Sequence, residues 1–210
     1  MNAKARESEN NSVQVINTNI KSMQAYFGIA TITSFIVLIM IRICNLKGQG
    51  IEAIEFGKKD KKDFLILPFA LFYFYLITAN TFNLPTIERQ ELFHIEILSW
   101  IGVLTCLIAL ILFLWTLVSF RKSFRIGLVE NRAQGLITTG TFAISRNPIY
   151  LSFAIMLIGQ FLIYASWILL IYLFVGILTF HRQVLKEENF LMEQYGEEFN
   201  TYCTKVRRYF

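Results

Sequence analysis

Long apolar runs alternate with short polar segments along most of the chain. Apolar residues dominate over 23–44, 64–82 and 95–120. Each run is close to or above the roughly 20 residues that an α-helix needs to cross a 30 Å hydrocarbon core. A fourth run, 148–180, has 33 residues without a charged side chain. The pattern therefore predicts an all-α integral membrane protein.

The fourth run is too long for one span. As a single helix it would measure about 50 Å at a rise of 1.5 Å per residue. We therefore expect a helical hairpin that turns at residues 164–167 and gives two short spans of roughly 16 residues each. The second arm is expected to continue past His181 into water, because no helix breaker occurs before Gly196. With the three preceding runs, five transmembrane helices are predicted.

The polar segments divide the chain into three parts. Residues 1–21 are rich in asparagine and lack the apolar centre and cleavage site of a signal peptide, so we expect a polar, disordered tail. Residues 22–120 hold the first three spans, and residues 121–210 hold the candidate chemistry. Within the second part, residues 45–63 contain the run KKDKKD, which is typical of a solvated loop.

Composition supports the membrane interpretation. The chain is 55% hydrophobic and 15% aromatic, with a mean hydropathy of +0.49, which argues against a soluble globule and against a nucleic-acid partner. Membrane lipids are the expected surroundings. Cys44, Cys106 and Cys203 lie far apart and show no metal-binding spacing, so no metal site is predicted.

The positions of the basic residues predict an orientation. Of the 20 Lys and Arg residues, 16 fall within 42–63, 119–147 and 181–210, whereas four fall on the opposite side of a five-span topology. The positive-inside rule then places the N-terminus outside. The C-terminal segment and the polar segment before residue 148 face the cytoplasm.

The segment 135–150, GLITTGTFAISRNPIY, is polar and lies directly against the charge-free run. Asn147 and Pro148 suit the cap and the first position of a helix. The free amides of such a helix start, beside the cation of Arg146, attract carboxylates and phosphates. The residues alone leave two interpretations open, a site for a charged small molecule and an ordinary interfacial loop.

A second polar segment, 181–196, places one carboxylate on an apolar stripe. Glu188 belongs to this stripe, whereas Glu187 lies about 100° around the helix. Glu188 is either a partner for segment 135–150 or a surface acid on a weakly amphipathic helix. Gly196 is expected to end the helix, before a short tail with a basic end. The stripe consists of Val184, Glu188, Leu191 and Tyr195.

Together the two segments resemble the isoprenylcysteine carboxyl methyltransferase family and the related phospholipid methyltransferases. The resemblance lies in G-L-I-T-T-G-T-F-x-x-S-R-N-P-I-Y and, after a membrane hairpin, in E-E-x-x-L-x-x-x-Y-G-E-E-F-x-x-Y. It covers residues 120–208. The chain departs from many members in having Asn147 where they have histidine, and asparagine cannot take a proton near neutral pH.

The resemblance implies S-adenosylmethionine-dependent methyl transfer at the cytosolic membrane face. In that case Arg146 and the helix start oppose the cofactor carboxylate, Glu188 accepts from its ribose hydroxyls or amino group, and Tyr150 packs near its sulfonium. Arg146 and Glu188 are the candidate catalytic residues. The implied cofactor-binding residues are Gly140, Arg146, Asn147, Pro148, Tyr150, Glu187 and Glu188.

The methyl acceptor stays open among lipophilic molecules. An isoprenylcysteine-type carboxylate or a small hydrophobic thiol needs alignment more than acid–base help, whereas a phospholipid ammonium group must be deprotonated by something other than Asn147. The alternative of another class is a non-catalytic membrane protein that binds lipid or a partner. A transporter or channel is disfavoured, because the predicted spans contain no buried ionisable residues that would line an ion path.

Overall fold

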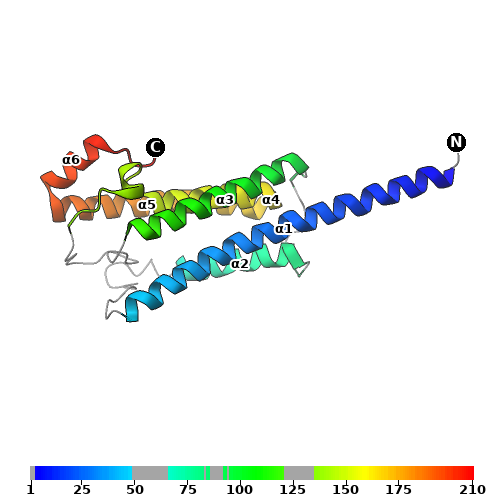
Figure 1. Ribbon diagram of the computed structural model, residues 1–210, viewed down its shortest axis with the longest axis horizontal. Helices are drawn as coiled ribbons and strands as arrows, with labels where there is room; N and C mark the ends of the chain where they lie inside the picture. Colours follow the sequence, from blue (N-terminus) through cyan, green and yellow to red (C-terminus); the bar gives the residue numbers. More distant parts are fainter. Residues whose placement is uncertain (1–2, 49–65, 83, 86–91, 94, 121–134) are drawn as a thin grey trace.

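The computed structural model is built from helices over the described residues, which are 3–48, 66–82, 84–85, 92–93, 95, 96–120 and 135–210. Five long helices lie along the same axis, and α6 folds back at one end (Figure 1). The helices are α1 (Ala3–Gly48), α2 (Ile66–Phe82), α3 (Glu96–Ser119), the short 3-10 helix η2 (Gly140–Ala143), α4 (Pro148–Tyr164), α5 (Trp167–Tyr195) and α6 (Glu197–Lys205).

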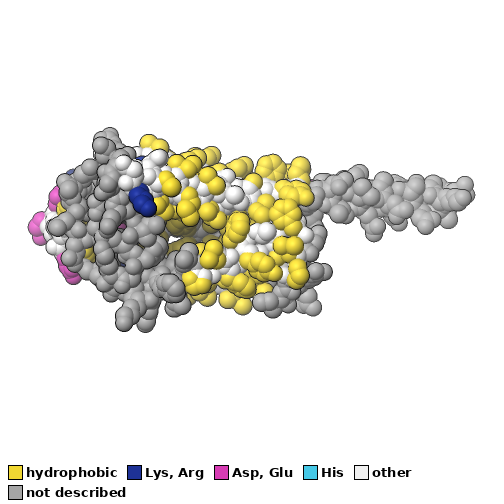
Figure 2. All heavy atoms as spheres, turned by 90° about the horizontal axis from the view of Figure 1, so that it is seen from below, with side chains coloured by type: hydrophobic (Ala, Val, Ile, Leu, Met, Phe, Trp, Pro, Cys, Tyr) yellow, Lys and Arg dark blue, Asp and Glu magenta, His cyan; other side chains and the backbone are white. Residues whose placement is uncertain are grey.

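The helices form the all-α membrane protein that the sequence predicts. Met23–Gly48, Glu96–Ser119 and Trp167–Tyr195 are long and apolar enough to cross a membrane. The apolar helices α2 and α4 each have 17 residues, which is close to the lower limit for crossing. Figure 2 shows hydrophobic side chains over the side of the bundle, as a lipid-facing surface requires.

The predicted hairpin is confirmed. α4 ends at Tyr164, and α5 begins at Trp167 and runs to Tyr195, where Gly196 ends it. Ala165 reverses the chain with a left-handed backbone (φ 36°, ψ 51°), and the Ser166 side chain caps α5 by accepting from the Leu169 amide. The charge-free run therefore folds back so that the start of α4 and the end of α5 lie at the same end of the bundle (Figure 1).

Close packing fixes α4 against α3, its most extensive partner in the bundle. Gly102 and Gly159 face each other where the two helices cross. A Cβ added at Gly102 would lie 2.7 Å from the Gly159 carbonyl oxygen, and one added at Gly159 would lie 2.6 Å from Cys106 Sγ. Small residues thus let the two backbones approach, which is a common solution in membranes.

Polar side chains tie α1, α2 and α4 together at the end far from α6. Tyr164 donates its hydroxyl to the Ala25 carbonyl at 2.8 Å and lies 2.8 Å from Thr81 Oγ1. Gln160 Nε2 donates to the Gly28 carbonyl at 2.8 Å, and its Oε1 is buried with no hydrogen-bond partner among the described residues. These bonds join segments that are far apart in the sequence.

The N-terminal segment differs from the prediction. Residues 1–21 were expected to be a disordered tail, but α1 is helical from Ala3 and has 46 residues. Neither proline nor glycine occurs before Gly28, so nothing in the sequence breaks the helix that continues from the apolar span. At its other end α1 runs on to Gly48, into the expected charged loop, and residues 49–63 of that loop lie outside the described residues.

Candidate functional site

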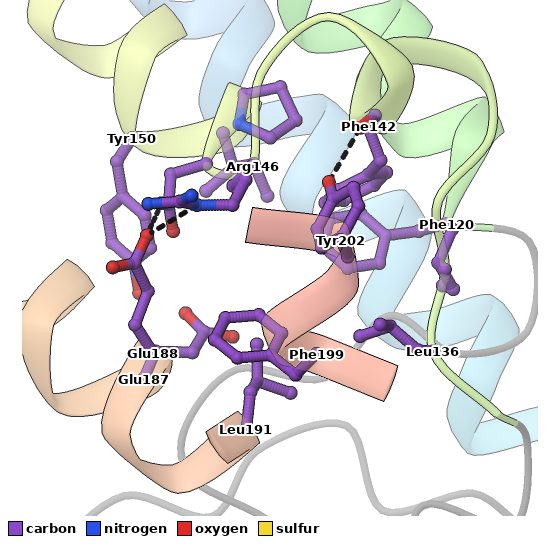
Figure 3. Close-up of a pocket in the computed structure, with 14 residues that line it drawn as sticks. Phe120, Leu136, Phe142, Arg146, Tyr150, Glu187, Glu188, Leu191, Phe199 and Tyr202 are labelled. Carbon is purple, nitrogen blue, oxygen red and sulfur yellow. Dashed lines mark hydrogen bonds and ion pairs between the residues drawn. The ribbon is translucent and has the colours of Figure 1, made fainter. Parts of the chain in front are cut away.

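The two polar segments meet at one pocket, at the end of the bundle where α6 lies (Figure 3). The start of α4 forms one wall, and the end of α5 forms another. Six of the seven residues implied as cofactor-binding line the pocket, while Gly140 does not. The six are Arg146, Asn147, Pro148, Tyr150, Glu187 and Glu188.

Glu188 points from α5 toward the residues that precede α4. Its side chain is 10% exposed, and Arg146 Nε donates to its Oε1 at 3.1 Å in an ion pair. Asn147 Nδ2 donates to the same oxygen at 3.0 Å. The apolar-stripe prediction for Glu188 is thereby confirmed, because Val184 and Glu188 on that face are both buried.

A second arginine, from the segment after α6, completes the ion pairs. Arg208 Nε and Nη2 lie 2.9 and 2.8 Å from Glu188 Oε2. Burial alone would raise the pKa of Glu188, but the hydrogen bond from Arg208 and the charges of Arg146 and Arg208 outweigh it, so the pKa lies below its usual value. The same hydrogen bond raises the pKa of Arg208. Glu188 is therefore ionised at neutral pH.

Asn147 occupies the predicted cap position of α4 but does not cap it with its side chain. The residue has φ −130° and ψ 54°, and its amide group turns away to Glu188. Its own backbone N–H donates to Ser145 Oγ at 3.2 Å. Charge-assisted bonding to a buried carboxylate is stronger than a neutral cap, which explains the difference. The first backbone N–H groups of α4 are consequently left without this side-chain acceptor.

Gly140 lies beside the end of α3 rather than in the pocket wall. Its φ is +69°, and a Cβ at this position would lie 2.3 Å from Ser119 Oγ. That hydroxyl accepts from the Thr141 amide at 3.2 Å and donates to the Trp115 carbonyl at 2.9 Å. Gly140 thus lets the chain turn tightly against α3, which gives this glycine a structural role.

Apolar residues form the rest of the pocket, and the sequence did not predict them as site residues. Phe142 comes from η2, Leu191 from α5, and Phe199 and Tyr202 from α6 (Figure 3). Tyr202 is buried and donates its hydroxyl to the Phe142 carbonyl at 2.6 Å. The spacing of two aromatic residues three apart after Gly196 was the available signal, because it places both on one helical face.

The main chain at the end of α6 and just after it pairs with the residues before α4. The Arg146 amide donates to the Arg207 carbonyl at 3.0 Å, and Ser145 Oγ donates to the Arg208 carbonyl at 3.2 Å. Arg146 Nη1 donates to the carbonyls of Cys203 and Val206 at 3.1 and 3.0 Å. Residues 202–208, which we call the C-terminal strap, therefore join the end of α6 to the residues before α4, and Tyr202 of this strap lines the pocket.

The arrangement combines a charged wall, formed by Arg146, Glu187, Glu188 and the start of α4, with an apolar wall. Arg146 and the start of α4 suit a carboxylate or phosphate, while the aromatic residues suit a flat apolar group. The cavity measures about 70 Å³, which is below the roughly 300–1,000 Å³ of typical small-molecule sites. The described residues thus form a small cavity whose lining combines charged and apolar groups.

Comparison with known proteins identifies a related family. Residues 97–198 match the family model described as phospholipid methyltransferase. No curated protein matches the chain. The matched region runs from α3 to the start of α6, and it includes Arg146 and Glu188 but ends before the C-terminal strap. Over this region, which carries the hairpin and both polar walls of the pocket, the chain is similar to the phospholipid methyltransferases.

Proposed function

We propose that the chain is an S-adenosylmethionine-dependent methyltransferase that acts on a lipophilic acceptor at the membrane surface. The observation that carries the proposal is the meeting of two motifs some 40 residues apart at one pocket, where Arg146 and Glu188 pair at 3.1 Å. The family match over residues 97–198 supports methyl transfer as the reaction.

The residues present fit the chemistry of this cofactor. Arg146 bonds through Nε and Nη1 to groups of the chain, while no bond from its Nη2 is found among the described residues, so Nη2 can serve the cofactor carboxylate. The amides at the start of α4 suit the same group. The Tyr150 ring can face a sulfonium by a cation–π interaction. When bound, the cofactor supplies a methyl group on a positively charged sulfur.

The chain's contribution is positioning rather than proton transfer. Methyl transfer is an in-line displacement, so alignment of acceptor and donor lowers the barrier most. Asn147 cannot act as a base, and Glu188 is held ionised between two arginines. Both residues instead hold the start of α4 in place. The implied role of Glu188 as a direct acceptor for the cofactor stays a prediction beside this positioning role.

We take a phospholipid amine as the first acceptor to test, because the matched family is described by phospholipids. An isoprenylcysteine-type carboxylate and a hydrophobic thiol are the other two classes. The Tyr150 ring lies 6.2 Å from that of Phe180, which in turn lies 5.7 Å from that of Phe153 deeper in the apolar bundle. An apolar acceptor chain in the bilayer would find aromatic surface leading to the pocket.

The proposal includes an orientation, with the pocket in the cytoplasm and the N-terminus outside. Of the three segments rich in Lys and Arg, the described parts, 42–48, 135–147 and 181–210, lie toward the pocket end of the bundle (Figure 1), and the positive-inside rule assigns such segments to the cytoplasm. Labelling of a cysteine substituted at Lys205, in a background without Cys44, Cys106 and Cys203, tests this. Labelling from the cytoplasmic side is expected, and labelling only from outside would reverse the orientation.

Calorimetry with S-adenosylmethionine on the detergent-solubilised protein tests the enzyme proposal. We expect saturable binding that Arg146→Ala weakens at least about tenfold, because the variant removes a charged hydrogen-bond donor. Arg207→Ala is the matched control, because Arg207 is exposed and outside the pocket lining. Its affinity should equal that of the wild type.

Transfer of a labelled methyl group then identifies the acceptor. The protein is incubated with the labelled cofactor and with vesicles that contain phosphatidylethanolamine, a farnesylated cysteine analogue or an alkyl thiol. Label in one class that disappears with Arg146→Ala supports the enzyme and names its acceptor. Absence of cofactor binding by the wild type would leave the alternative of a non-catalytic lipid-binding or partner-binding scaffold.

A further inference from the structure

Both oxygens of the Glu188 carboxylate are engaged by side chains of the chain itself. A carboxylate offers about four lone-pair sites, two on each oxygen. Oε1 accepts from Arg146 at 3.1 Å and from Asn147 at 3.0 Å. Oε2 accepts from Arg208 Nε at 2.9 Å, and Arg208 Nη2 lies 2.8 Å from it in an ion pair. Glu188 is therefore the centre of a network that holds three neighbours in fixed directions.

Arg208 is the member of this network that stands outside the pocket. Its side chain is 38% exposed, against 11% for Arg146 and 10% for Glu188. Arg146, Asn147 and Glu188 all line the pocket, whereas Arg208 is not among the described residues that do so. Among the described residues, the contacts of Arg208 with the pocket lining run through Glu188 and through its own main chain.

The main chain of Arg208 reaches the same two pocket residues from the other side. Its carbonyl accepts from Ser145 Oγ at 3.2 Å and from Asn147 Nδ2 at 3.4 Å. Ser145 Oγ in turn accepts from the Asn147 amide at 3.2 Å. Asn147 directly precedes α4, so its position sets where the first amides of α4 point. Side chain and main chain of Arg208 thus act on one target.

We propose that Arg208 is a positioning residue that sets the affinity of the pocket for the cofactor without touching it. The identity of the ligand in this inference rests on the function proposed above. With Arg208 replaced, Glu188 keeps donors on Oε1 alone, and its carboxylate is free to rotate toward Arg146. The Arg146 guanidinium, which is bonded to this carboxylate, then moves with it and turns away from the pocket. The Asn147 side chain loses a hydrogen-bond acceptor of fixed position.

The neighbouring Arg207 gives a matched comparison for charge. Both residues lie after α6 and carry one positive charge, but Arg207 is exposed and Arg208 is half-buried. A general loss of positive potential near the pocket would therefore appear in Arg207→Gln and in Arg208→Gln alike. Arg208→Lys keeps the charge but replaces two N–H groups in a fixed fork by a single ammonium.

The experiment measures two properties of the full-length protein in detergent. The first is the dissociation constant for S-adenosylmethionine. The second is amide hydrogen exchange at residues 145–151 in the absence of cofactor. We expect Arg208→Gln to weaken binding about tenfold or more, in line with the loss of a charge-assisted bond. Exchange at 145–151 should rise, while exchange in α3 stays unchanged.

The comparison variants define the outcomes. Arg207→Gln should match the wild type in both properties, and Arg208→Lys should recover part of the lost affinity. Equal affinity and equal exchange for Arg207→Gln and Arg208→Gln would overturn the proposal. So would faster exchange throughout the bundle with unchanged affinity, because that result describes a structural role alone. If the wild type binds no cofactor, the proposed function fails, while the exchange at 145–151 still decides whether Arg208 positions this segment.

Discussion

Replacement of Gly140 by alanine is expected to destabilise the protein by about 2–4 kcal/mol. The φ of +69° costs a residue with a Cβ about 1–2 kcal/mol. The added Cβ would also lie 2.3 Å from Ser119 Oγ and 2.9 Å from Ser119 Cβ, so the serine has to move. That movement strains the bonds between Ser119 and both Trp115 and Thr141, each worth about 1 kcal/mol.

Two other glycines separate these contributions. Gly196 has φ +49°, ψ −119° and nothing within 4 Å of an added Cβ, so Gly196→Ala reports backbone strain alone and should cost about 1–3 kcal/mol. Gly135 has open space and no positive φ, so Gly135→Ala should be neutral or stabilising by up to about 1 kcal/mol. Both strained glycines should therefore tolerate alanine less well than Gly135 does.

Reversible unfolding in mixed detergent, followed by circular dichroism, measures the free energies. The double variant Ser119→Ala/Gly140→Ala removes the 2.3 Å contact but keeps the 2.9 Å one, so it should be more stable than the sum of the single effects predicts. Equal stability of Gly140→Ala and Gly135→Ala would refute the reasoning, because neither strain nor contact would then exist at Gly140.

Three further changes test other parts of the structure. Tyr202→Phe should lower stability by about 1–2 kcal/mol, since the buried Phe142 carbonyl loses its donor, and equilibrium unfolding that matches the wild type would contradict that bond. Glu188→Gln should lower the melting temperature at neutral pH. Because the folded-state pKa of Glu188 lies below the ordinary 4.5, the contribution of the carboxylate is complete above that pH and disappears as the pH falls through the folded-state pKa. Melting curves of the two proteins should thus converge in acid, and a gap that stays constant would exclude the ion pairs as its source. Gln160→Leu should change stability by less than about 1 kcal/mol, because it removes an unpartnered buried oxygen along with two bonds, whereas Gln160→Ala should cost about 2–3 kcal/mol in the same unfolding assay.

The hairpin could be predicted from sequence because a length limit governs it. A charge-free run of 33 residues has to turn, and a turn near its middle gives two arms that reach the hydrocarbon boundary. The side of α5 that buries Glu188 followed from helical spacing alone. Local periodicity and bilayer thickness decide both features, so no knowledge of distant contacts was needed.

The partners of these residues depend on segments far apart in the chain. Asn147 was assigned to the cap of α4 by local preference, but the carboxylate of Glu188, 41 residues later, competes more strongly for its side chain. Gly140 was assigned to the site because it lies in the motif, and the sequence did not reveal that Ser119 on α3 leaves no room for a Cβ there. In both cases the deciding contact comes from a residue far away in the sequence.

The C-terminal strap is the largest part of the site that the sequence did not predict. Its residues form a short segment of mixed polarity with a basic end, and α6 has only nine residues. A helix this short has little stability of its own. What holds it is a set of bonds to residues around η2 and α4, some 60 positions earlier in the chain. Such bonds leave no periodic trace in the sequence.

The separation between the strap and its partners has a consequence for biosynthesis. Tyr202 bonds to Phe142 across 60 residues, and at about 5–20 residues per second the ribosome needs several seconds to make that stretch. The contacts of the strap with η2 and with the residues before α4 can therefore form only several seconds after those residues are made. A chain that ends before residue 202 would keep helices α1 to α5 but lack the bonds that Tyr202, Cys203 and Arg208 supply to the site.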